Sequence, residues 1–286
     1  MTASVESLPV PRSRPGALAR AWAFVKRHAL GVYSLLAFVY LLIPIAVVIV
    51  FSFNNPKGRF NYTWQGFTLD NWRNWDAVPG LSDAMKLSLE IAFLSALLAT
   101  ALGTAIALAL VRYLFRGRGP TNLVIFLPMS TPEIVLGASL LTLFLTLSVV
   151  QGFWTIVIAH IMFCISYVVV TVKARLISFD RHLEEAAMDL GANEWATFRK
   201  VTLPLIAPAI LAGALLSFAL SIDDFTVTYF VAGPKITFPL FVWGAARVGA
   251  PPQVNVIGTA IFIVALAAML ANVLFQRRRE QGAAAA

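Results

Sequence analysis

The sequence predicts an all-α integral membrane protein with six transmembrane helices. Three observations favour this fold class. First, 59% of the 286 residues are hydrophobic and 13% are charged, with a mean hydropathy of +0.80, which is typical of membrane proteins. Second, six apolar runs reach the length of about 20 residues with which a helix crosses a bilayer. Third, most Lys and Arg residues lie at the ends of these runs, so the net charge of +8 indicates membrane orientation and not nucleic-acid binding.

The six apolar runs alternate with polar connections along the chain. Pro44 is expected to kink the first run, and Pro128 and Pro132 to interrupt the third, because proline removes a backbone donor from a helix. The expected spans are residues 30–53, 85–111, 122–147, 153–172, 205–222 and 254–275.

The basic residues set the expected orientation. Sixteen of the 22 Lys and Arg residues fall in the two tails, the connection between the second and third runs, and the connection between the fourth and fifth. Cytoplasmic segments are enriched in these residues. We therefore expect a cytoplasmic tail at 1–29, a transmembrane domain at 30–275, an external loop at 54–84, a cytoplasmic loop at 173–204 and a cytoplasmic tail at 276–286. Three Trp residues of the external loop predict an interfacial belt or a loop core, and a docking surface is the alternative.

The polar segment 184–204 lies between two apolar runs and predicts a helix-turn-helix elbow. Apolar positions recur at helical spacing across 183–190. Gly191 is expected to follow the first helix in the left-handed conformation, Asn193 to cap the second helix, and Pro204 to end it. One interpretation is a docking site for another protein. The other is a pair of amphipathic helices lying on lipid headgroups.

The spacing within this elbow resembles the EAA signature of bacterial ABC importer permeases, EAA-x3-G-x9-I-x-L-P. Val201 stands at the Ile position and is the only departure. The resemblance implies that the elbow is the coupling helix, which sits in a groove of a cytoplasmic ATPase subunit. Small Ala side chains permit close approach, and an acidic side chain can pair with a basic one across the contact. The residues expected to make this coupling are Glu184, Glu185, Ala186, Ala187, Asp189, Gly191, Leu203 and Pro204.

Besides Glu90 in the second span, three carboxylates lie inside or at the end of predicted spans, where a charge is costly and needs a reason. Glu133 lies in the third span, and Asp223 and Asp224 end the fifth on the external side. Neighbouring helical side chains point about 100° apart, so at most one Asp faces a pathway squarely. The pair is either an interfacial cap in external water or a negative patch that receives a cationic solute, with aromatic rings supplying cation–π faces. The expected substrate pathway is Glu133, Asp223, Asp224, Phe225, Tyr229 and Trp243.

Further motifs make the resemblance more specific. The segments FSFNN, WQGFTLDNW, STPEIVLGASLL, LSFALSIDDFTVTYFVAGP and PPQVN follow the order found in permease subunits of spermidine/putrescine ABC importers, over about residues 45–275. Glu133 stands where that family commonly has Asp, and Gln253 replaces a Glu. The resemblance implies a type I importer permease in a bacterial cytoplasmic membrane, moving polyamines by alternating access. The implied partners are a homologous second permease, two ATPase subunits, an extracytoplasmic binding protein and membrane lipid, with no nucleic acid.

The chain contains no G-x-x-x-x-G-K-[ST] loop, so ATP and Mg²⁺ are expected on the partner ATPase, with no cofactor, metal or catalytic group in this chain. His160, alone within the fourth run, is expected to bond a neighbouring helix. Other functions stay open. One alternative is an importer permease for another small cation, an amino-acid derivative or a metal complex. Another is a self-contained channel or secondary carrier, but this alternative gives the elbow no role. A membrane enzyme is disfavoured, because His, Asp and Glu do not cluster with ligand spacing.

Overall fold

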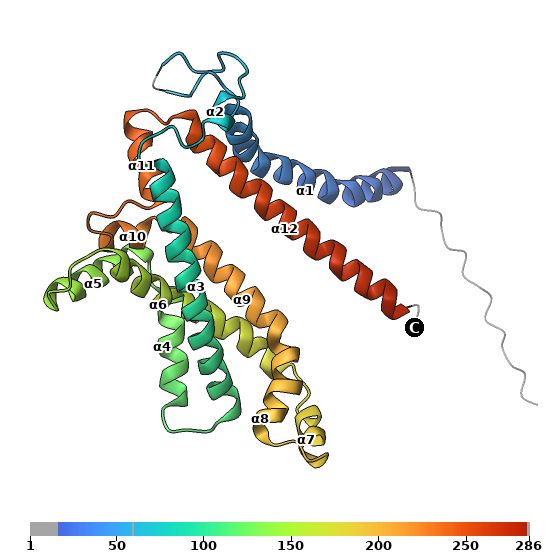
Figure 1. The fold of residues 1–286 in the computed structure, drawn as a ribbon. Coiled ribbons are helices and arrows are strands. Elements are labelled where there is room, and N and C mark those ends of the chain that lie inside the picture. Colours follow the sequence, from blue (N-terminus) through green and yellow to red (C-terminus); the bar gives the residue numbers. More distant parts are fainter. Residues whose placement is uncertain (1–16, 59, 285–286) are drawn as a thin grey trace, which may run out of the picture.

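The computed structural model describes residues 17–58 and 60–284, with side chains placed between residues 28 and 270 except 59 and 268. Within these ranges the regular structure is helical, apart from one isolated β-bridge between Asn54 and Phe67. The elements (Figure 1) are α1 Ala17–Phe51, α2 Asp70–Arg73, α3 Leu81–Arg112, α4 Arg118–Ser130, α5 Glu133–Thr146, α6 Phe153–Ile177, α7 His182–Asp189, α8 Glu194–Thr197, the π-helical turn η1 Phe198–Thr202, α9 Leu203–Asp223, α10 Thr226–Val231, α11 Phe238–Val248 and α12 Pro252–Ala284.

Three long helices, α3, α6 and α9, pack against one another to form the central bundle (Figure 1). Small side chains let helix backbones approach closely in a membrane. A Cβ atom added at Gly103 of α3 would lie 2.7 Å from the Cβ of Val168 on α6, so glycine is required at this crossing. The buried face of α3 carries small residues at almost every turn, namely Ala84, Ser88, Ala92, Ala96, Ala99, Gly103 and Ala107.

Four helical segments have the length and apolarity of a membrane span: His28–Phe51, Leu81–Arg112, Phe153–Ile177 and Glu194–Asp223. They correspond to the first, second, fourth and fifth predicted runs. The predicted count of six is therefore met only in part by the described residues. The sixth run lies in α12, whose stretch Pro252–Ala267 is apolar but shorter than a span, and the described side chains become incomplete from residue 268.

The third predicted run is broken into α4 and α5, which are bent by 110° relative to each other. The ring of Pro132 excludes the helical conformation of the residue before it, so Thr131 is extended (φ −83°, ψ 132°) and α4 ends at Ser130. Pro128 does not interrupt the run, contrary to the prediction, because one backbone bond lost near a helix end leaves the rest of α4 intact. With α4 and α5 counted as one bent span, the described residues contain up to five spans.

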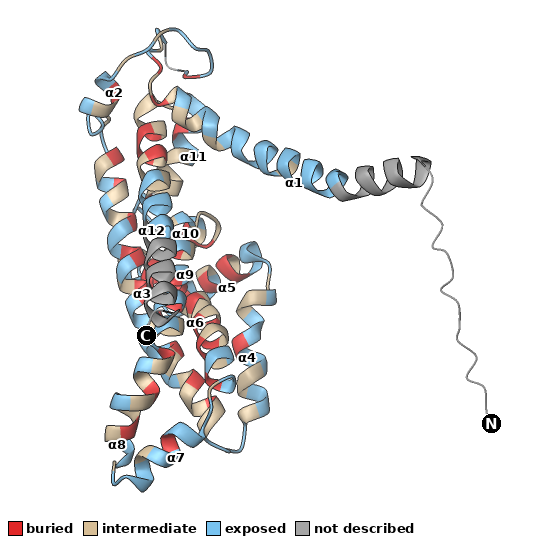
Figure 2. Cartoon of the chain, turned by 90° about the vertical axis from the view of Figure 1, so that its right-hand side faces the viewer, coloured by how far each residue is buried: buried red, intermediate tan, exposed pale blue. Residues whose placement is uncertain are grey.

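Helices α1 and α12 contact each other and extend away from the central bundle (Figure 1). None of the apolar window within His28–Phe51 is buried, and the colouring of Figure 2 marks most of the described residues of α1 as exposed. Gly258 of α12 lies against α1, with its Cβ position 3.5 Å from Val48. A helix that is apolar on all sides needs lipid or another helix around it.

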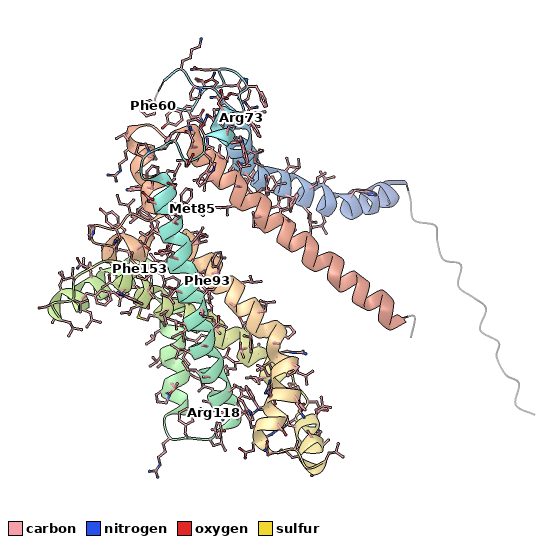
Figure 3. All side chains as sticks on the ribbon, viewed as in Figure 1. Phe60, Arg73, Met85, Phe93, Arg118 and Phe153 are labelled. Carbon is pink, nitrogen blue, oxygen red and sulfur yellow. The ribbon has the colours of Figure 1, made fainter. Side chains whose placement is uncertain are left out.

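The two ends of the bundle carry different structures. Arg73 lies at one end and Arg118 at the other (Figure 3). At the Arg73 end, the ring of Phe53 stacks on Phe67 and on Trp72, each with centroids 5.5 Å apart, so Trp72 belongs to a loop core, as one of the two predictions for the external Trp residues states. The elbow helices α7 and α8 lie at the Arg118 end (Figure 1).

Candidate substrate cavity and coupling elbow

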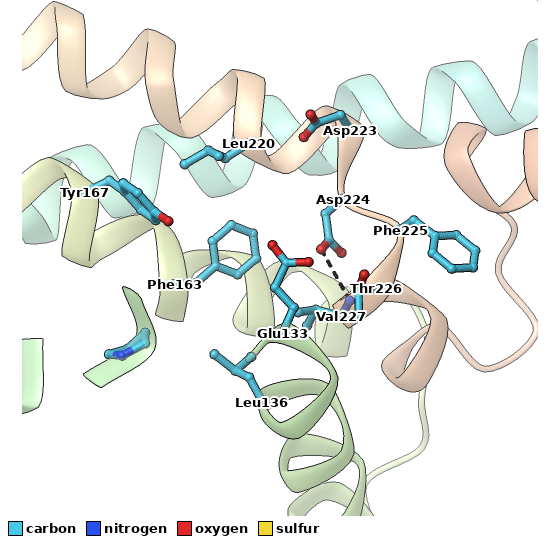
Figure 4. Close-up of a pocket in the computed structure, with 11 residues that line it drawn as sticks. Glu133, Leu136, Phe163, Tyr167, Leu220, Asp223, Asp224, Phe225, Thr226 and Val227 are labelled. Carbon is cyan, nitrogen blue, oxygen red and sulfur yellow. Dashed lines mark hydrogen bonds between the residues drawn. The ribbon is translucent and has the colours of Figure 1, made fainter. Parts of the chain in front are cut away.

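A cavity of about 270 Å³ lies where α5, α6, α9 and α10 meet, about halfway along the bundle (Figures 1 and 4). The carboxylates of Glu133, Asp223 and Asp224 line it together, and none of the lining residues is Lys, Arg or His. The break at Pro132 makes Glu133 the first residue of α5, while the end of α9 places the two Asp residues opposite. The structure therefore brings the three carboxylates of the predicted pathway into one cavity.

Asp224 is bound to the protein wall of this cavity. Its carboxylate accepts hydrogen bonds from the backbone N–H of Val227 (3.3 Å), the backbone N–H of Thr228 (2.7 Å) and the Thr228 hydroxyl (2.7 Å). Figure 4 draws the bond to Val227. Only 7% of the side chain is exposed. A carboxylate that accepts N–H groups of the first helical turn acts as an N-terminal cap, so Asp224 holds α10 in place.

Asp223 and Glu133 are the exposed carboxylates of the cavity. Within the described part of the chain, neither forms an ion pair. The sequence did not distinguish between the adjacent Asp residues. The geometry does, because α9 ends at Asp223 and the backbone leaves the helix at Asp224 (ψ 118°), which turns the second carboxylate toward α10. The uncompensated negative charge of the cavity thus comes from Asp223 and Glu133.

His160 links α6 to the two elements that carry the Asp pair. Its Nδ1 lies 2.6 Å from the Ser221 hydroxyl of α9, and its Nε2 lies 2.9 Å from the Thr228 hydroxyl and 3.3 Å from an oxygen of Asp224. The prediction that this histidine bonds a neighbouring helix is confirmed. A buried imidazole with both nitrogens occupied holds the wall of the cavity together and does not face its interior.

The aromatic residues predicted near the Asp pair lie together, but only one of them lines the cavity. The Phe225 ring centroid is 5.7 Å from that of Tyr229 and 5.1 Å from that of Trp243. Phe225 alone is in the cavity wall. The guanidinium of Arg247 lies 4.7 Å from the Trp243 ring centroid, so a cation of the chain itself occupies one face of that ring. A pathway role for Tyr229 and Trp243 stays a prediction.

Two aromatic residues of the cavity were not among the predicted ones. Phe163 and Tyr167 reach the cavity from α6. They follow His160 by three and seven residues, which places all three on one face of a helix. Because His160 itself does not line the cavity, this spacing alone does not identify them; their place in the wall depends on which helices pack against α6.

The turn of the elbow has the predicted local structure. Gly191 follows α7 in the left-handed conformation, with φ +88°, and its N–H donates to the Met188 carbonyl at 2.9 Å. The Asn193 side chain accepts the backbone N–H of Ala196 at 2.8 Å and caps α8. Both predictions are confirmed.

The second elbow helix does not end at Pro204, contrary to the prediction. Instead, α8, η1 and α9 run on as one segment, Glu194–Asp223. In η1 the N–H of Leu203 bonds to the carbonyl of Phe198, five residues earlier, and such wide turns occur within continuous helices. Pro204 follows this wide turn directly. The turn already shifts the hydrogen-bond register, so the missing N–H of Pro204 does not end the helix. The elbow is therefore joined to α9 by continuous helical backbone.

The predicted coupling residues differ in exposure. Two apolar residues that were not among them project from the elbow: Leu190, which follows α7, is 90% exposed, and Trp195 in α8 is 67% exposed. Glu184 differs from the others, because it is only 9% exposed and bonds to Arg112 of the same chain. Its carboxylate therefore faces this chain and not a partner. The exposed predicted residues are Glu185, Ala186, Asp189, Gly191 and Pro204, and the half-buried ones are Ala187 and Leu203.

An exposed acid–base pair lies at the start of α7. The Oδ1 atom of Asp180 lies 3.0 Å from the backbone N of His182, whose N–H donates to it, and 2.7 Å from the ring Nδ1. The side-chain hydrogen bond raises the pKa of His182 and lowers the pKa of Asp180. Because both side chains are exposed to water, screening keeps the interaction weak.

Comparison with known proteins supports a transport role. A sequence model described as "Binding-protein-dependent transport system inner membrane component" matches residues 99–280. The spermidine/putrescine transport system permease protein PotC of Escherichia coli (strain K12) is 42% identical over 253 residues, which cover 88% of this chain and 95% of that protein. The putrescine transport system permease protein PotI of the same organism is 38% identical, covering 87% of this chain and 92% of that protein.

The fold is shared with solved ABC transporters. A chain of a bacterial ABC transporter involved in the import of the acidic polysaccharide alginate superposes with a TM-score of 0.63 at 17% identity, covering 93% of this chain and 99% of that chain. A chain of the MetNI methionine ABC transporter superposes with a TM-score of 0.54 at 16% identity, covering 68% of this chain and 92% of that chain. These two likenesses concern the fold. The match over residues 99–280 and the 42% identity to PotC show that the chain belongs to the family of inner membrane components of binding-protein-dependent transport systems.

Proposed function

We propose that this chain is one permease subunit of a bacterial polyamine importer and forms half of the passage for spermidine or putrescine. The observation that carries the proposal is the cavity in which Glu133, Asp223 and Asp224 meet without a basic lining residue. A site with this charge favours cations and repels anions. The identity to permeases whose names include spermidine and putrescine supports the same substrate class.

The cavity suits an alkyl chain that carries ammonium groups. Glu133 and Asp223 approach it from different helices and provide two separate carboxylates. A hydrogen bond from an ammonium group to a carboxylate contributes about 1.5–3 kcal/mol. The rings of Phe163, Tyr167 and Phe225 cover the methylene groups between the charges and offer their faces to the cation. Asp224 keeps the wall in place by capping α10.

The surroundings of the cavity support an assembly of several subunits. The exposed apolar surfaces of α1 and α12 suit a homologous second permease and lipid. The elbow lies at the end that carries Arg112, Arg116 and Arg118, which we assign to the cytoplasm, and two ATPase subunits dock there with their ATP and Mg²⁺. Both tails, 1–29 and 276–286, are then cytoplasmic. An extracytoplasmic binding protein delivers the substrate at the opposite end.

The continuous helix Glu194–Asp223 supports alternating access. One end of this segment is the elbow helix α8, and the other end is Asp223 at the cavity. Thirty residues of helix extend over roughly 45 Å. When the ATPase subunits close on ATP, the displacement of the elbow is therefore transmitted along this helix to Asp223 at the cavity. The cavity then closes toward one side of the membrane and opens toward the other.

Uptake by the reconstituted assembly tests the proposal. The chain is purified with its second permease and ATPase, placed in proteoliposomes, and supplied with its binding protein and labelled spermidine. We expect uptake that requires ATP, that an excess of putrescine inhibits and that an excess of alanine does not. An ATPase variant without hydrolysis is the matched control. Uptake of a neutral or anionic solute in place of spermidine, or uptake without ATP, contradicts the proposed function.

A further inference from the structure

A partly buried ion pair connects the elbow to a helix far away in the sequence. The Nη2 atom of Arg112, the last residue of α3, lies 2.5 Å from Oε1 of Glu184 on α7. The hydroxyl of Thr202 in η1 donates to the same oxygen at 2.5 Å. One carboxylate oxygen therefore joins the elbow helix α7 to the end of α3 and to η1, the turn that precedes α9.

The basic partner of this contact is held in place by a further group. The guanidinium of Arg112 lies 5.7 Å from the ring centroid of Phe179, in the connection between α6 and α7. A cation at the C-terminal end of a helix is also favoured by the helix dipole. We call Arg112, Phe179, Glu184 and Thr202 the Glu184 cluster.

The partial burial of the cluster makes its contact strong. Only 16% of the Arg112 side chain and 11% of the Glu184 side chain are exposed, so solvent screens this pair much less than the exposed Asp180–His182 pair. Removing one charge leaves the other in a partly desolvated place without its partner. The contact between α7 and α3 therefore depends on both charges.

We propose that Glu184 is a positioning residue that ties the coupling elbow to α3, so that a displacement of the elbow moves α3 and α9 together. The elbow is continuous with α9 through η1, whereas its connection to Arg112 is not through the adjoining backbone. Helices α3 and α9 pack against each other, so moving one without the other would shear their interface. This inference rests on the proposed function, because it requires an ATPase to move the elbow.

Hydrogen–deuterium exchange of the assembled complex separates transmission of movement from mere stability. Peptides from α7 and from the last turn of α3 are followed with and without a non-hydrolysable ATP analogue and Mg²⁺. In the unchanged complex, we expect the nucleotide to alter exchange in both peptides. In Glu184→Gln, which keeps the shape and removes the charge, we expect the α7 response to persist and the α3 response to fall roughly tenfold, as for loss of a charged hydrogen bond.

Two further variants serve as controls. Reversing the pair with Arg112→Glu and Glu184→Arg should restore the α3 response in part, and Thr202→Val, which removes one hydrogen bond at nearly constant shape, should weaken it. If Glu184→Gln does not assemble, the Thr202→Val complex decides. An α3 response that is unchanged in both single variants, or a rise in exchange of equal size with and without nucleotide, overturns the inference. The absence of any nucleotide response of α7 in the unchanged complex overturns instead the proposed docking of the ATPase.

Discussion

Replacing Asp223 by Asn is expected to slow polyamine uptake while the protein stays assembled. The carboxylate is exposed at the cavity and has no ion-pair partner within the described residues. A charged hydrogen bond to an ammonium group contributes about 1.5–3 kcal/mol. Its loss should therefore lower uptake at low spermidine concentration by roughly tenfold to a hundredfold. The measurement is the initial rate of ATP-dependent uptake per assembled complex.

Replacing the neighbouring Asp224 by Asn is expected to act on stability instead. The carboxylate accepts three hydrogen bonds from Val227 and Thr228 and lies 3.3 Å from His160. An Asn side chain has one acceptor oxygen and turns an NH₂ group toward the other donors. Loss of a cap costs about 1 kcal/mol, and loss of a charged hydrogen bond about 1.5–3 kcal/mol. The melting temperature and the yield of the complex should fall, while uptake per assembled complex falls less than in Asp223→Asn.

One outcome would reverse the roles assigned to Asp223 and Asp224. If Asp224→Asn assembles with an unchanged melting temperature and slows uptake more than Asp223→Asn, then the carboxylate that meets the substrate is the one assigned here to α10. Glu133→Gln is expected to behave like Asp223→Asn, because both carboxylates are exposed at the cavity. Leu220→Met, another change in the cavity wall, controls for altered shape at constant charge.

Three other perturbations test the fold and the elbow. Gly103→Ala should lower the stability of the complex by about 1–3 kcal/mol, because the new Cβ would lie 2.7 Å from both the Cβ and the Cγ1 of Val168. Val168→Gly removes both atoms, so the double variant should lose less stability than the sum of the two single losses; an additive loss contradicts this. Gly191→Val should cost about 1–2 kcal/mol at φ +88° and reduce co-purification of the ATPase, whereas Gly191→Asn should be milder. The raised pKa of His182 means that the stability gained from its bond to Asp180 is present below the unfolded pKa of the histidine and is lost as pH rises through the folded value. The lowered pKa of Asp180 means that the carboxylate loses the bond only at acid pH. Amide exchange in α7, corrected for its intrinsic pH dependence, should therefore become faster between about pH 6 and pH 8, and His182→Gln should remove that change.

Local features followed from the sequence with few errors. Gly191 and Asn193 were identified from their positions relative to apolar residues a few places away, because a left-handed turn and a helix cap depend on the chemistry of one or two residues. Four of the predicted spans correspond to helices of the described chain, because the length and apolarity that a bilayer demands are readable in a short window. The break at Pro132 was also predicted, although the bend of 110° was not.

The tertiary structure alone decided which charged groups are free and which are bound. Sequence reasoning treated Glu184 as part of the docking surface and left Asp223 and Asp224 equivalent. The partner of Glu184 lies 72 residues away, and Asp224 lies beside His160, 64 positions earlier in the chain. The period of a helix determines the face on which a side chain lies. It does not determine which distant helix lies opposite that face, and this packing sets burial, hydrogen bonding and therefore the role of each carboxylate.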